Sequence, residues 1–217
     1  MKLVFRGYFK NESQLPKGVL PSSAVKFREP QTKTQSLVLS LVLALFMSIL
    51  IIAITVAIEL FWRGGEIVYT GDGPVMDILN LVPDFTTLGV VFALIALIPH
   101  ELLHAVCFGK GAEVEMFFKS TGAFVTSTKP ISKNRFIFLS LLPNVVFGVI
   151  PLILWAVLPY NAAYSSHLHT FATAGLVIGV GDYVNVFNAL RQMPKGSIQQ
   201  LSGSHSYWFT STENKTA

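Results

Sequence analysis

The chain has 217 residues, of which 52% are hydrophobic and only 13% are charged, and its formal net charge is +4. Soluble domains carry about 25% charged residues, so this composition excludes an ordinary soluble enzyme and a disordered chain. The length is that of a single domain. Cys107 is the one cysteine, which excludes an intrachain disulfide and a cysteine-rich zinc site.

Four apolar stretches are long enough to cross a bilayer, which takes about 20 mostly apolar residues. They are residues 36–62, 87–108, 136–158 and 170–190. The sequence therefore predicts an all-α polytopic membrane protein with about four transmembrane helices. His167 and His169 are expected in the short outer loop before the last helix.

The placement of the positive charges gives the expected orientation. Fifteen of the sixteen Lys and Arg residues lie in residues 1–35, 110–135 and 191–217, on one side of a four-span arrangement. The positive-inside rule puts that side, with both termini, in the cytoplasm. We therefore expect a multi-pass protein of the cell membrane, with an interfacial segment at 1–35, a transmembrane domain at 36–190 and a cytoplasmic tail at 191–217. The bilayer accounts for the basic charge, so no nucleic-acid partner is expected, and the sequence leaves the oligomeric state open.

The loop after the second apolar stretch carries a partial alternation of apolar and polar residues. It runs from Glu113 to Thr128, with Gly122 near its middle, and predicts a short β-hairpin on the cytoplasmic side. An unpaired edge of such a hairpin can pair with an extended peptide. A short amphipathic connector fits the same pattern.

The second apolar stretch contains the motif H-E-x-x-H, at His100, Glu101 and His104. Residues four apart lie on one face of a helix, so two imidazoles can bind one Zn²⁺ and leave room for a third ligand and a water. In zincins the glutamate takes the proton of the zinc-bound water. Such polar groups are costly inside a membrane span and therefore indicate function. The alternative is a pair of core histidines that are hydrogen-bonded to neighbouring helices.

Asp182, in the last apolar stretch, is the expected third zinc ligand. The helical rise puts His100 and Asp182 at a similar depth, about 12–14 Å from the cytoplasmic face. Asp182 could instead be a helix-packing or proton-relay carboxylate. Asn144 shares this depth and is a candidate for holding the substrate backbone. Asn185, three residues after Asp182, is a candidate for orienting that carboxylate or a histidine, although packing hydrogen bonds would explain it equally well.

These residues resemble the site-2 proteases, intramembrane zinc metalloproteases with H-E-x-x-H in one helix and an aspartate ligand in a later one. More closely, the chain resembles a family of small bacterial membrane proteins described as putative zincin peptidases. Further matching segments are Leu15-Pro16, Ala24–Phe27, Glu29-Pro30, Gly181-Asp182 with Asn185, Met193–Gly196 and His205–Trp208. The resemblance implies that His100, His104 and Asp182 bind zinc and that Glu101 is the catalytic base. Unlike the site-2 proteases, the chain has no glycine after the aspartate.

The favoured interpretation is an intramembrane zinc metalloprotease with one Zn²⁺. It would hydrolyse peptide bonds of transmembrane or membrane-associated substrates near the cytoplasmic side of the bilayer. Two alternatives belong to other classes. One is a metal-binding membrane scaffold without proteolytic activity, and the other is a metal or proton transporter.

Overall fold

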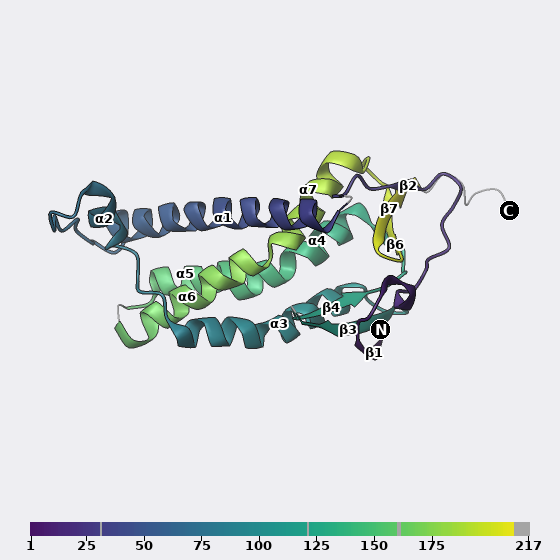
Figure 1. Ribbon diagram of the computed structural model, residues 1–217, viewed down its shortest axis with the longest axis horizontal. Coiled ribbons are helices and arrows are strands. Elements are labelled where there is room, and N and C mark those ends of the chain that lie inside the picture. Colours follow the sequence, from purple (N-terminus) through teal and green to yellow (C-terminus); the bar gives the residue numbers. More distant parts are fainter. Residues whose placement is uncertain (31, 121, 160–161, 211–217) are drawn as a thin grey trace. The chain divides into compact units, whose positions relative to one another are not determined.

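The computed structural model describes residues 1–30, 32–120, 122–159 and 162–210 (Figure 1). These residues are mostly helical, with 55% of the chain in helices, and they also form two small β-sheets. It forms two compact units, each built from segments that are distant in the sequence. The sheet unit comprises residues 1–30, 97–143 and 181–217, and the helical unit comprises residues 31–96 and 144–180. Residues 211–217 of the predicted tail lie outside the described residues.

The helical unit is a bundle of long apolar helices. Its elements are α1 (Lys33–Phe61), α2 (Pro74–Leu79), the first part of α3 (Thr87–Cys107), the π-helical turn η2 (Val145–Val149), α5 (Ile150–Val157) and α6 (Ala162–Ile178). Helix α6 packs against α1, α5 and η2 (Figure 1). The core of this unit consists of Ile51, Leu152, Trp155, Ala172 and Leu176. Most of the α1 surface stays exposed and apolar, as a lipid-facing helix requires.

Helix α6 begins earlier than the sequence pattern indicated. His167 and His169, expected in a loop, lie inside this helix. His169 is buried, and its Nε2 lies 2.9 Å from the Thr55 hydroxyl. The Trp155 indole packs against the His169 ring and donates a hydrogen bond to Ser165. The sequence pattern indicated a loop because this segment is polar. It can form a helix because partners on other helices satisfy its polar groups.

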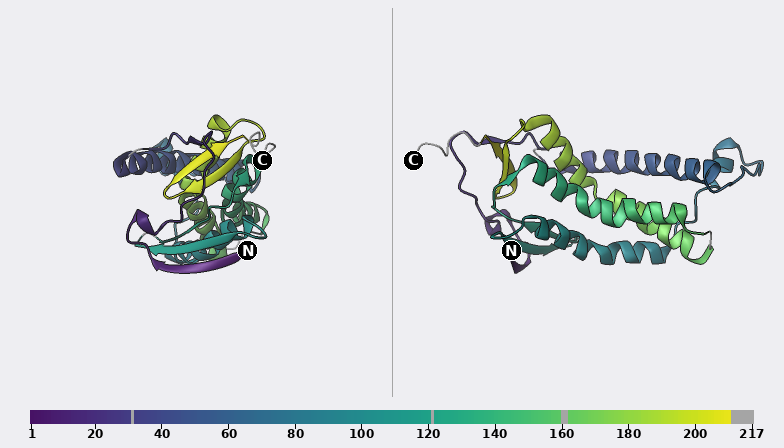
Figure 2. Two further views of the ribbon diagram at one scale, coloured as in Figure 1. Left: turned by 90° about the vertical axis from the view of Figure 1, so that its right-hand side faces the viewer. Right: turned by 180° about the vertical axis from the view of Figure 1, so that it is seen from behind.

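The sheet unit contains a three-stranded sheet in the order β1-β3-β4. Strand β3 (Glu113–Lys119) pairs with β4 (Gly122–Thr126) in an antiparallel hairpin, which confirms the predicted hairpin after the second apolar helix. Strand β1 (Lys2–Tyr8) adds in parallel on the other side of β3, as Figure 2 shows in purple. The end of helix α3, strand β3 and strand β4 therefore follow one another along the chain, and all three lie in the sheet unit.

A second sheet shows that an all-α description is too narrow. Its order is β2 (Val25–Lys26), β7 (His205–Phe209), β6 (Ile198–Ser202) and β5 (Ile131–Ser132). The segments expected to be an interfacial N-terminus and a tail thus both supply strands. These strands have two to five residues and mostly pair with partners far along the chain, so local patterns do not reveal them.

Among the described residues, three to four helices are long and apolar enough to cross a membrane, where the sequence predicts about four. Three stand alone: Thr34–Phe61, Thr87–Cys107 and Lys133–Val157, the last of which joins α4 (Lys133–Asn144), η2 and α5. A fourth would consist of the bent pair α6 and α7 (Val180–Gln192), interrupted at Gly179. The Asn144 carboxamide occupies the space that a Cβ at residue 179 would need, so close packing demands glycine there. The predicted helix at 170–190 is therefore longer and broken.

Candidate metal centre

The H-E-x-x-H motif occupies the last two turns of α3, in the sheet unit. The helix ends where Gly109 adopts a φ of +74°, a left-handed conformation that glycine tolerates best. Its last carbonyls are capped by cations: Arg135 donates to the Cys107 carbonyl at 2.6 Å, and Lys129 donates to the Phe108 carbonyl at 3.1 Å. These contacts fix the C-terminal end of α3, and with it the turn that carries His104.

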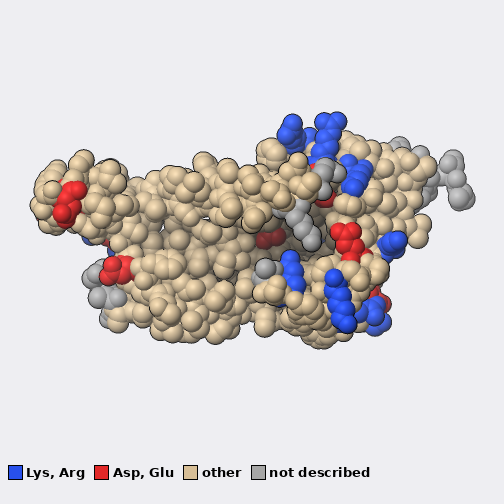
Figure 3. Space-filling view, in the orientation of Figure 1, with Lys and Arg blue, Asp and Glu red and all other residues tan. Residues whose placement is uncertain are grey.

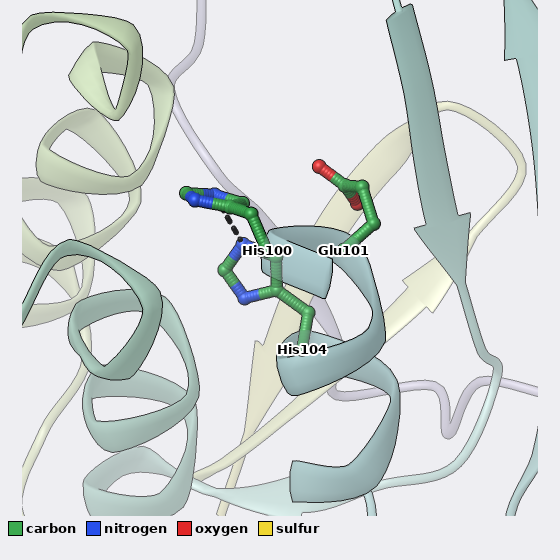
Figure 4. Close-up of side chains that lie close together, drawn as sticks. All are labelled: His100, Glu101 and His104. Atoms are coloured by element: carbon green, nitrogen blue, oxygen red, sulfur yellow. Dashed lines mark hydrogen bonds between the residues drawn. The ribbon is translucent and has the colours of Figure 1, made fainter. Parts of the chain in front are cut away.

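His100 and His104 lie on one face of α3, as the spacing predicts. Their Nε2 atoms are 3.2 Å apart, and the ring centroids are 4.9 Å apart with the planes at 78°. Both residues are buried. Figure 4 shows the two rings together on one side of the helix, with the Glu101 side chain next to the neighbouring strand. The two imidazole nitrogens therefore converge on one point.

Asp182, in the first turn of α7, brings a carboxylate to the same point. Its Oδ2 lies 3.2 Å from the His100 Nε2, and its Oδ1 lies 3.3 Å from the His104 Nε2. The Asp182 side chain is only 13% exposed. The negative charge near the N-terminus of α7 also suits the helix dipole. The two histidines and Asp182, which follows His104 by 78 residues in the sequence, thus face one another within one compact unit.

The tautomer of His104 is fixed by a backbone carbonyl. Its Nδ1 donates a hydrogen bond of 2.9 Å to the Leu139 carbonyl on α4. That carbonyl is available because Pro143, four residues later inside the helix, has no N–H to donate to it. The Nε2 of the neutral ring therefore carries a lone pair, which points toward Asp182.

This donor set fits a zinc ion. A lone pair that faces a carboxylate oxygen at 3.3 Å needs a proton or a cation between the two atoms, because both are acceptors. Zinc bonds of about 2.0–2.1 Å in a tetrahedron separate neighbouring ligand atoms by about 3.3 Å. The two imidazole Nε2 atoms are 3.2 Å apart, and they lie 3.2 and 3.3 Å from the two different oxygens of the Asp182 carboxylate. Two imidazoles and one carboxylate are also a ligand set that zinc favours in catalytic sites.

Glu101 lies at the same site but is held differently. Its Oε2 accepts a hydrogen bond of 3.0 Å from the Val125 amide of β4. Its carboxylate and the nitrogens of His100 and His104 lie within 4.8 Å of one another, so these three residues alone also form a possible metal site. Glu101 and Asp182 are therefore two candidates for the third ligand. We favour Asp182 because it contacts both imidazoles, whereas a strand amide already holds Glu101.

The two asparagines that the sequence predicts near the site lie in different surroundings. Asn144 belongs to the helical unit, where it is buried at the end of α4 and packs against Gly179. Asn185 is half-buried on α7, one turn after Asp182. Their predicted contacts with substrate and with the metal ligands stay predictions. Sequence reasoning missed the Leu139 carbonyl and the Val125 amide, because backbone groups leave no trace in residue identity. The proline at 143 was the one available signal for the first of them.

Comparison with known proteins bears on the same residues. Residues 93–198 match the model of a family described as "putative zincin peptidase". That span contains the whole H-E-x-x-H motif, the β3–β4 hairpin and Asp182. No curated protein and no solved structure gives a significant match to the chain. Residues 93–198, just under half of the chain, therefore place the candidate metal centre inside a segment that is similar to the putative zincin peptidase family.

Proposed function

We propose that this protein is a zinc-dependent metallopeptidase that cleaves membrane-associated or transmembrane peptides at a site within the bilayer. The observation that carries the proposal is the convergence of His100, His104 and Asp182 beside Glu101. The first two donors lie on one candidate span, and the third lies in the bent pair that forms another. This is also the arrangement for which the sequence resembles the site-2 proteases.

His100, His104 and Asp182 would hold one Zn²⁺ through two imidazole nitrogens and a carboxylate. When bound, zinc supplies a water whose pKa is near 7 and a Lewis acid that polarises the scissile carbonyl. The hydrogen bond from His104 to the Leu139 carbonyl keeps the ring oriented and keeps its Nε2 free of a proton. Removing such an orienting partner typically weakens metal binding 10- to 100-fold.

Glu101 would serve as general base and then as general acid. One carboxylate oxygen accepts the Val125 amide, which fixes the rotamer and leaves the other oxygen to take a proton from the attacking water. The same oxygen then delivers that proton to the nitrogen of the leaving amine as the C–N bond breaks. One water is consumed for each peptide bond, and Glu101 returns to its starting state.

Strand β4 offers a place for the substrate backbone. It is an edge strand of its sheet among the described residues, and the Val125 amide points away from β3 toward Glu101. Because outward groups recur at every second residue, the Ala123 amide and carbonyl and the Val125 carbonyl share that edge. An extended peptide that adds to β4 would therefore run past Glu101, with main-chain hydrogen bonds supplying affinity without a fixed sequence.

The depth of the site suits a substrate within the membrane. His100 lies seven residues before the end of α3, so the helical rise puts it about 10 Å from that end. The loop that follows carries Lys110, Lys119 and Lys129, and the positive-inside rule puts such a loop in the cytoplasm. Cleavage is therefore proposed to take place in the cytoplasmic half of the bilayer.

The test is a search for new peptide N-termini in membranes incubated with the purified full chain in detergent. Wild type should produce cleavages that Glu101→Gln reduces at least about 100-fold, the usual contribution of a general base. Glu113→Gln removes one exposed carboxylate of the same unit and should cleave like wild type. A metal chelator should abolish the cleavage. Identical products from wild type and Glu101→Gln would contradict the proposal, and stoichiometric zinc without any cleavage would favour the scaffold instead.

A further inference from the structure

A basic cavity of about 350 Å³ lies in the sheet unit, between β2 and the end of α7. Its lining includes Lys26, Arg28, Asn188, Arg191, Gln192 and Trp208. The cavity is distinct from the candidate metal centre, because His100, Glu101, His104 and Asp182 are absent from its lining. The proposed peptidase activity gives it no role.

The walls are held together by contacts that do not involve the charged groups. The Gln192 side chain accepts a hydrogen bond from the Arg28 amide at 2.7 Å and donates one to the Arg28 carbonyl at 3.3 Å. It also donates to the Asn188 carboxamide at 2.9 Å. On the other side, β2 pairs with β7 and sets Lys26 opposite Tyr207. The cavity is therefore built by backbone pairing and amide side chains, which leaves its cations available for a ligand.

Three positive charges surround this cavity without a carboxylate to balance them. Lys26, Arg28 and Arg191 are all exposed. Among the described residues, no carboxylate oxygen lies within 4.0 Å of their charged nitrogens. The C-terminal end of α7 contributes a partial negative charge of about −0.5, which three full positive charges outweigh. The cavity therefore favours an anion.

The position in the chain indicates which anion. The lining residues of α7 belong to its last turns, where this candidate span ends. Figure 3 shows Lys and Arg side chains gathered over this part of the sheet unit. Trp208 adds an aromatic ring of the kind that favours the level of the lipid headgroups. Basic pockets at the cytoplasmic ends of membrane helices suit phosphate-bearing headgroups, and the planar guanidinium fork matches phosphate oxygens.

We propose that this cavity binds a phosphate group, with the headgroup of an anionic phospholipid as its source in the membrane. The two arginines would donate hydrogen bonds to the phosphate oxygens, and Lys26 would add a third positive charge. Occupation would tie β2 to the end of α7. A free phosphate ion has the same chemistry, so the test must separate the two sources.

The experiment measures lipid binding to the full chain, purified in a neutral detergent, by native mass spectrometry and calorimetry. The probes are short-chain phosphatidylglycerol, short-chain phosphatidylcholine and inorganic phosphate. The site variant combines Lys26→Gln, Arg28→Gln and Arg191→Gln. A control variant of equal charge combines Lys10→Gln, Lys119→Gln and Lys195→Gln, which lie outside the cavity. Zinc content and unfolding temperature establish that both variants are folded.

Wild type should bind phosphatidylglycerol more tightly than phosphatidylcholine, which carries no net charge. The site variant should bind it about 100-fold more weakly, because each of its three substituted cations contributes about 1 kcal/mol, or about fivefold. The control variant should bind like wild type. Inorganic phosphate that matches the lipid in affinity would support the site but assign it to soluble phosphate.

Three results would overturn the proposal: equal weakening in both triple variants, no preference for phosphatidylglycerol, or no binding to wild type. If the triple site variant does not fold, Arg28→Gln and Arg191→Gln are measured singly. The Arg28 contacts that build the wall use its backbone, so each single variant should keep the cavity and lose about fivefold in affinity.

Discussion

The two carboxylates of the metal centre can be separated by one pair of substitutions. Asp182 contacts both imidazoles, whereas Glu101 accepts a strand amide, so they should differ in their effect on metal binding. Asp182→Asn keeps the shape of the side chain but removes an anionic ligand. Glu101→Gln keeps its shape and removes only the proposed base. We therefore expect Asp182→Asn to lose zinc and Glu101→Gln to retain it.

The size of the effect follows from the number of ligands. Structural zinc sites with four protein ligands bind with about 10–16 kcal/mol, or about 3 kcal/mol for each ligand. Loss of the carboxylate of Asp182 should therefore weaken zinc binding about 100-fold. Since Glu101 contributes no ligand atom in this arrangement, Glu101→Gln should change the affinity by less than about threefold, well below the effect of losing a ligand.

The assay is zinc content of the purified chain, together with competition against a chromophoric chelator. Zinc binding to the folded state also raises the unfolding temperature, so metal removal should lower it in wild type and in Glu101→Gln. Metal removal should leave Asp182→Asn unchanged. Glu113→Gln, with the same charge change at an exposed position, should behave like wild type. The reverse pattern, with zinc lost in Glu101→Gln and kept in Asp182→Asn, would falsify the assignment and make Glu101 the third ligand.

Two further predictions concern stability. Burial raises the pKa of Glu29 above its ordinary value of 4.5, although hydrogen bonds from Ser206 and His205 oppose the shift. The folded carboxyl thus binds its proton more tightly than the unfolded chain does, so the free energy of unfolding falls as pH rises from about 4.5. Glu29→Gln should remove this loss of stability. The unfolding temperature of the variant relative to that of wild type should therefore rise between about pH 4.5 and 7. A difference in unfolding temperature that stays constant with pH would contradict this prediction. Gly179→Ala should cost about 1–3 kcal/mol, because its Cβ would overlap the Asn144 carboxamide, and thermal unfolding should show a lower midpoint. Gly181→Ala meets open space and should not destabilise, while adding Asn144→Ala should relieve the cost at residue 179.

The local parts of this protein could be predicted from its sequence. The apolar stretches predict α1, α3 and the helices that follow the β-hairpin, because about 20 apolar residues in a row have few other stable environments. The motif at His100, Glu101 and His104 fixes two imidazoles on one helical face, since the spacing equals about one turn. The hairpin after α3 was also predicted, because its alternation and its glycine are neighbours in the chain.

Contacts between distant segments of the chain could not be predicted from the sequence. Depth along two helices suggested Asp182 as a partner for the histidines, but only the fold shows it 3.2 Å from His100. Strand β1 lies more than 100 residues from β3, and the pairing of β2 with β7 spans an even longer interval. Such pairings depend on the summed packing of the unit, so a short strand carries no mark of its partner.

The backbone groups at the site were likewise decided by the tertiary structure alone. Pro143 shows in the sequence that a carbonyl must lose its helical partner, but the fold determines that His104 becomes the new donor. The Val125 amide reaches Glu101 because β4 is an edge strand, and a strand becomes an edge only through the order of its sheet. The sequence by itself thus determined which side chains can do the chemistry. The tertiary structure decided how they are oriented, because orientation depends on backbone groups whose partners are set by long-range packing.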